Sequence, residues 1–176
     1  MEAEAGLLHI DATSVDVTAT PERCWDALVW VVGGQMAGTP ARVLAAVLGC
    51  ADRRARGPRE VPGSALGGFH VVAAEPPRRW CLEGRHRFSV YALEFRIEEP
   101  APGRSRLCAV SRAAFPGWRG SLYRALVIGS GGHRTAVRRM LRSVKRRAEA
   151  DAIPAGSDTG TNTGTDTGTG AGTGGA

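Results

Sequence analysis

The feature that most restricts the fold is a run of apolar and polar residues that alternate from Phe69 to Phe115. Such alternation is typical of strands that bury one face. Turns interrupt the run at Glu75-Pro76-Pro77 and at residues 100–103, where proline cannot donate a hydrogen bond to a sheet ladder. Gly84 is expected to form another hairpin corner. Short turns between consecutive strands predict an antiparallel meander.

The residues before the meander predict a strand and a helix. The strand extends over Leu7–Ala19, and the apolar face changes near Ser14, which predicts a bulge there. Thr20 is a good helix N-cap and Pro21 fits the first helical position. Gly33-Gly34 is expected to end this helix.

Three further helices are predicted from apolar spacing. The first begins at Thr39-Pro40 and stops at Gly49, and its inward residues are expected to be Val43, Leu44, Val47 and Leu48. A short helix over Leu122–Ile128 is expected to break at Gly129–Gly132. The chain's strongest helical pattern then starts at Thr135, with an apolar stripe of Val137, Met140, Leu141, Val144 and Ala148.

The charge is concentrated in one part of the chain. The net charge is +6, yet residues 100–148 hold 12 basic residues and no acid. Such a segment could bind nucleic acid or another polyanion. However, residues 135–147 contain no aromatic side chain and no nucleic-acid-binding motif, so a solvated helix face is the preferred interpretation.

Composition also bears on compartment and cofactors. The longest apolar runs, such as Ala27–Val32, are far shorter than the roughly 20 residues of a membrane span. The acidic start and the four dispersed cysteines predict a cytoplasmic protein without a leader or disulfide framework. The four histidines lack metal-ligand spacing, and no nucleotide or hydrolase motif occurs, so neither a metal nor a cofactor is expected.

The order of these elements resembles the helix-grip fold of the START-like superfamily, also called SRPBCC, which includes polyketide cyclases and lipid-transfer proteins. The segments that carry the resemblance are Val15–Leu28, Phe69–Trp80 and Tyr91–Ile97. The resemblance implies an α+β fold in which a curved antiparallel sheet wraps a long C-terminal helix, with two short helices after the first strand. The domain would cover residues 1–150, and the Gly/Thr-rich residues 151–176 are expected to be a disordered tail.

The same resemblance implies a cavity between the sheet and the last helix. Small residues on the expected inner face, Ala73, Ala109, Ser111 and Ala113, would either leave a pocket or let the helix pack closely. A hydrophobic or amphipathic small molecule is the expected ligand. The expected binding residues are Arg85, Arg87, Ser89, Tyr91, Leu93, Phe95, Leu107, Ser111, Phe115, Trp118 and Tyr123.

Two clusters could add chemistry to that cavity. Alternation would place Arg85, Arg87, Ser89 and Tyr91 on the same face as Leu93, where the arginines could hold a carboxylate or phosphate. His86 or Tyr91 could transfer a proton. A solvated hairpin tip is the simpler interpretation of this cluster.

Trp118 and Tyr123 form the second cluster and would flank the cavity entrance, or else form an ordinary core corner. The leading alternative to a binding protein is a polyketide cyclase or dehydratase on the same scaffold. The other is an interaction module that uses the basic helix. The pattern indicates no particular oligomeric state.

Overall fold

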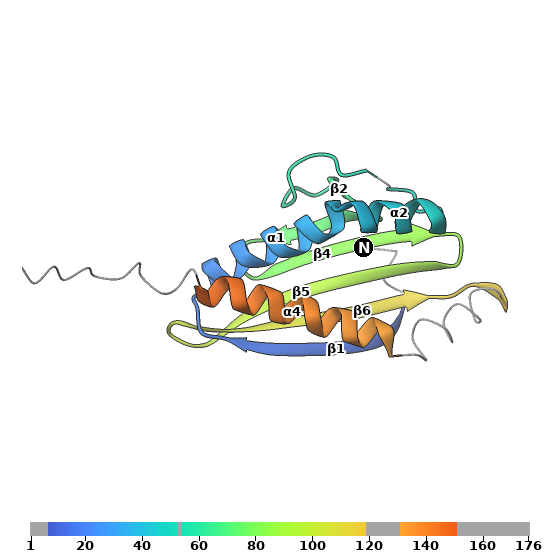
Figure 1. The fold of residues 1–176 in the computed structure, drawn as a ribbon. Helices are drawn as coiled ribbons and strands as arrows, with labels where there is room; N and C mark the ends of the chain where they lie inside the picture. The colour runs from blue at the N-terminus through green and yellow to red at the C-terminus, as the bar shows by residue number, and fades with distance from the viewer. Residues whose placement is uncertain (1–6, 53, 119–130, 151–176) are drawn as a thin grey trace, which may run out of the picture.

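The computed structural model describes residues 7–52, 54–118 and 131–150, and Figure 1 shows their arrangement. The helices are α1 (Pro21–Ala37), α2 (Thr39–Leu48) and α4 (Gly132–Ala150). The strands are β1 (Leu8–Val17), β2 (Ala65–Leu66), β3 (Phe69–Glu75), β4 (Arg79–His86), β5 (Ser89–Ala101) and β6 (Arg104–Ala114). The predicted α+β class and order of elements are confirmed. Helix Leu122–Ile128 and the residue 151–176 tail lie outside the described residues.

The described strands form a six-stranded antiparallel sheet in the order β1-β6-β5-β4-β3-β2. The meander from β3 to β6 is as predicted, and the first strand returns to pair with the last. The predicted bulge near Ser14 is wrong in position, because the register shifts between His9 and Asp11. This earlier shift brings Asp11 and Thr13 onto the same face as Val15.

Both α1 and α4 lie on one face of the sheet, which we call the inner face (Figure 1). The predicted stripe of α4 is confirmed, since Val137, Leu141, Val144 and Ala148 are buried. In Figure 1 the C-terminal end of α4 lies next to the start of α1, and the two helices separate toward the other end of the sheet. The helices therefore cover one end of the inner face more closely than the other.

Two helix predictions are wrong. Helix α1 passes through Gly33-Gly34 and continues to Ala37, because helical hydrogen bonding and packing outweigh the low helix propensity of two glycines. Helix α2 exposes Val43, Leu44 and Val47, whose exposed fractions are 58%, 58% and 69%. Since α1 already covers the sheet, α2 lies at its rim and buries Ala45 fully, while Leu48 is half-buried.

The hairpin between β4 and β5 also differs from the prediction. Strand β4 continues through Gly84 to His86, and the turn consists of Arg87 and Phe88. This shift decides which side chains face the helices.

No single described helix is long and apolar enough to cross a membrane; only α1 and α2 taken together meet that criterion, and they are bent by 57°.

Candidate functional site

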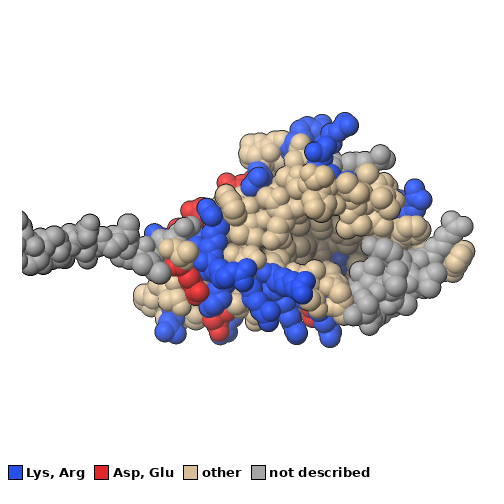
Figure 2. Space-filling model, in the orientation of Figure 1, with Lys and Arg blue, Asp and Glu red and all other residues tan. Residues whose placement is uncertain are grey.

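The candidate site lies on the inner face where α1 and α4 separate. Figure 2 shows that the surface is hollowed there, between the α1–α2 side of the molecule and the basic surface of α4. The ends of β4 and β6 and the beginning of β5 reach this part of the sheet (Figure 1). The side chains that these strands direct inward therefore decide what the hollow can hold.

Side chains on the inner face become smaller toward the hollow. At the closed end Trp80 and Phe95 are fully buried and stack with ring centroids 5.9 Å apart. Nearer the hollow, Leu93 pairs with Ser111, and Tyr91 pairs with Ala113. Large rings fill the first region, whereas serine and alanine leave room in the second.

Tyr91 would fill this room if it did not lean toward β4. A side chain on Gly84 would collide with the Tyr91 ring, so this glycine is what lets the ring lie across β4. The Tyr91 hydroxyl donates a hydrogen bond to the Gly68 carbonyl at 2.6 Å and lies 3.7 Å from the Cys50 sulfur. The ring therefore occupies the β4 side and leaves the surface over Ser111 and Ala113.

His86 faces the same end of the inner face and is only 8% exposed. Its Nδ1 accepts a hydrogen bond from the Phe88 N–H at 3.1 Å, which places the proton of the neutral ring on Nε2. Burial lowers the pKa of His86 below its ordinary value of 6.5. The ring, whose centroid is 5.3 Å from that of Tyr91, is therefore neutral at pH 7.

Polar groups meet on the β1–β6 side. Asp11 pairs with Ser111 across the sheet, accepts a hydrogen bond from Thr13 at 3.2 Å and forms an ion pair with Arg134 at 3.5 Å. The Ser111 Oγ and the His133 Nε2 are buried and have no hydrogen-bond partner in the described part of the chain. Burial lowers the pKa of His133, although the Asp11 charge partly opposes this.

Sequence reasoning missed Asp11 and His133. The alternation in β1 placed Asp11 on the polar face, and the earlier bulge is what turns it inward. His133 lay next to an expected glycine break, yet it is in the first turn of α4. The sequence held no signal that would have joined these two residues.

The hairpin prediction is partly wrong. Ser89, Tyr91 and Leu93 share the inner face, but Arg85 pairs with Val90 and lies on the opposite face, because β4 keeps its register past Gly84. Arg87 belongs to the turn and its guanidinium lies beside Gly49. The two arginines therefore do not flank the hollow together.

The other expected binding residues are distributed between the core and the rim. Phe95 and Leu107 are fully buried in the core, whereas Trp118 is 74% exposed and Phe115 is half-buried just after β6. Tyr123 lies outside the described residues. Ala73 is on the opposite face, since a second register shift between Val71 and Ala73 aligns it with Cys81.

The basic side chains of α4 differ in what they contact. Lys145 forms an ion pair with Glu149 at 2.8 Å, and the Arg147 guanidinium lies 3.8 Å from the ring centroid of Trp30. The exposed arginines Arg138 and Arg139 face solvent on the other side of the helix. Among the described residues, no group of three histidine, cysteine or acidic side chains could hold a metal ion.

Comparisons with known proteins define the fold. No protein-family model matches the chain, and no curated protein matches its sequence. Solved structures match at 10–16% identity. The Zhui aromatase/cyclase of Streptomyces sp. R1128 is 15% identical, with a TM-score of 0.55 over 85% of this chain and 98% of that one.

Two other structures agree with this match. Aha1 of Colwellia psychrerythraea is 16% identical, with a TM-score of 0.51 over 81% of this chain and 96% of that one. Ara h 8.0201 is 10% identical, with a TM-score of 0.50 over 82% of this chain and 99% of that one. The chain therefore has the helix-grip fold, as the resemblance predicted.

Proposed function

We propose that the chain binds a hydrophobic or amphipathic small molecule in the hollow between the sheet and α4. The observation that carries the proposal is the Ser111 hydroxyl, which is buried on the inner face of β6 and lacks a hydrogen-bond partner in the described part of the chain. A buried polar group without a hydrogen bond is costly and calls for an explanation. A polar group on the ligand would supply the missing partner.

The surroundings of Ser111 suit an amphipathic ligand. Leu93 and Ala113 offer apolar surface for its body, while Ser111 and the unpartnered His133 Nε2 offer hydrogen bonds to its polar end. A serine hydroxyl both donates and accepts, so it fits a hydroxyl or carbonyl group. The aromatase/cyclase that shares the fold supports a ligand of this general kind.

Blocking the hollow tests the proposal. Ala113→Phe adds a ring on the inner face of β6, opposite Tyr91, and we expect it to weaken the binding of Nile red, a neutral apolar dye, by about tenfold or more. Ala114→Phe is the matched control, because the neighbouring residue makes the same change on the opposite face. Equal affinity in both variants, measured by fluorescence titration of the full chain, would contradict the proposal.

The polar anchor has its own test. Ser111→Ala should weaken the binding of a long-chain alcohol by roughly two- to tenfold, which is the usual contribution of one hydrogen bond. The binding of the matching alkane should not change. Native mass spectrometry of the gently purified chain would show which molecule it retains. An equal loss of affinity for the alcohol and the alkane would show that Ser111 does not hydrogen-bond the polar end of the ligand.

A second candidate function is proton-transfer catalysis on a polyketide-like substrate. The observation that favours it is the neutral His86 ring, with its proton on Nε2, on the inner face beside Tyr91. His86→Gln should then abolish turnover of a poly-β-ketone and leave its binding intact. Unchanged turnover would reject His86 as the acid or base.

A further inference from the structure

Helix α2 is apolar on its exposed side. Apart from Thr39 and Arg42 it contains no polar residue, and Val43, Leu44 and Val47 are each more than half exposed. These three side chains follow one another at helical spacing and form one stripe. Contiguous apolar surface of this kind marks a site of contact with another molecule or a membrane.

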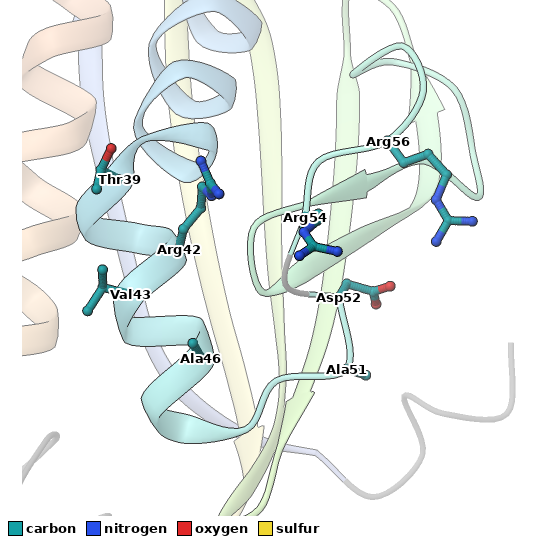
Figure 3. A pocket seen from close by; sticks show the side chains of 8 residues that line it. All are labelled: Thr39, Arg42, Val43, Ala46, Ala51, Asp52, Arg54 and Arg56. Atoms are coloured by element: carbon teal, nitrogen blue, oxygen red, sulfur yellow. The ribbon is translucent and has the colours of Figure 1, made fainter.

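A basic pocket adjoins this stripe. It has a volume of about 690 Å³ and lies between α2, which carries Arg42 and Val43, and the loop that carries Arg54 and Arg56 (Figure 3). Val43 belongs to both the stripe and the pocket, so the two features are continuous.

The charge in this pocket is not neutralised. In the described part of the chain, no acid forms an ion pair with Arg42, Arg54 or Arg56. The one acid that lines the pocket, Asp52, lies 3.4 Å from the His70 ring. The pocket therefore presents three guanidinium groups to an anionic partner.

We propose that α2, together with residues 51, 52 and 54–56, forms a docking surface for a lipid bilayer that carries anionic headgroups. The apolar stripe would enter the boundary between headgroups and acyl chains, and the three arginines would bind lipid phosphates. Two arguments favour this occupant. A soluble anion would leave the stripe in water, and a second copy of the chain would bring two arginine clusters together.

Vesicle sedimentation of the full chain tests the surface. The chain should bind vesicles of phosphatidylcholine and phosphatidylserine far better than vesicles of phosphatidylcholine alone. Neutralising the pocket with Arg42→Gln, Arg54→Gln and Arg56→Gln should weaken this binding roughly a hundredfold. The matched control neutralises three exposed arginines of α4 with Arg138→Gln, Arg139→Gln and Arg142→Gln, and we expect a much smaller loss.

A second variant addresses the apolar stripe. Val43→Ser, Leu44→Ser and Val47→Ser change exposed positions, so circular dichroism should show an intact fold while vesicle binding is lost. The proposal is overturned if this serine variant binds vesicles like the natural chain. It is also overturned if the pocket variant and the α4 variant, each with three Arg→Gln changes, lose vesicle binding equally. Tight binding of inorganic phosphate without vesicle binding, or a dimer that the serine variant dissociates, would equally overturn it.

Discussion

Glu94 shows how much one residue of the outer face contributes. It is 3% exposed, and its carboxylate accepts hydrogen bonds from Arg79 at 2.8 Å, Arg96 at 3.0 Å and Arg112 at 3.1 Å. Burial alone raises its pKa, but the hydrogen bonds from these arginines lower the pKa from 4.5 to about 2. The ionised form is therefore strongly favoured in the folded state.

The lowered pKa of Glu94 predicts that this residue's contribution to stability is lost in acid. A lowered pKa stabilises the fold above pH 4.5, by about 3 kcal/mol, and the contribution disappears as the pH falls toward 2. Glu94→Gln should remove both the contribution and its pH dependence in urea unfolding at several pH values. The exposed Glu98→Gln on the same strand should change stability by less than about 0.5 kcal/mol.

His86 predicts a second dependence, in a higher pH range. Because its folded pKa lies below 6.5, the unfolded chain takes up a proton first, and stability falls as the pH drops from 6.5 toward the folded pKa. His86→Gln should reduce this pH-dependent loss of stability, measured by urea unfolding at several pH values. The pKa of His133 is also lowered, so His133 accounts for another part of the loss. The exposed His9→Gln serves as control, and an equal flattening there would contradict the assignment.

At the scale of elements, glycine illustrates where sequence patterns succeed and fail. Gly49 adopts the positive φ of 71° that ends α2 as predicted. Gly33 does not end α1; it gives room to the Arg59 side chain, which a Cβ would strike. Both are glycines after an apolar stripe, and tertiary packing alone distinguishes them.

Two substitutions in α1 test this difference. A Cβ on Gly34 would meet no atom within 4 Å, so Gly34→Ala should stabilise the fold by about 0.5–1 kcal/mol. Gly33→Ala should gain less or destabilise, because the Arg59 side chain must move. Equal unfolding midpoints for the two variants in urea would show that Arg59 does not pack on Gly33.

The predictability of the site follows from strand register. Alternation in β5 correctly placed Ser89, Tyr91 and Leu93 together, because no bulge interrupts that segment. Alternation in β1 and β3 misplaced Asp11 and Ala73, since each of these residues follows a register shift that reverses the two faces of its strand. A one-residue shift has this effect on every side chain beyond it, and sequence periodicity does not locate it.

At the scale of the whole molecule, the fold was predictable because it depends on the order of elements. The exposed stripe of α2 was not predictable in this way, because helical spacing shows that apolar residues share a face without showing what covers it. Val43 and Val47 have the spacing of core residues and face solvent. The apolar stripe of α4, in contrast, packs against the sheet, as its spacing predicted.

The domain boundary gives a prediction at this scale. A chain that ends at Ala150 keeps every described helix and strand. Since residues 151–176 offer little apolar surface for burial, the shortened chain should have the same thermal unfolding midpoint as the full chain. A clearly lower midpoint in a calorimetric scan would show that the tail contributes to the fold.

The pairing of β1 with β6 also has a consequence for synthesis. Leu8 leaves the ribosome early, yet its partner Ala113 emerges only after the whole meander has been made. Until then the amino-terminal strand has no neighbour and its backbone groups remain open to other nascent chains. Closing this long-range pair is expected to be a slow and late event in folding, and the stage at which a chaperone would protect the chain most.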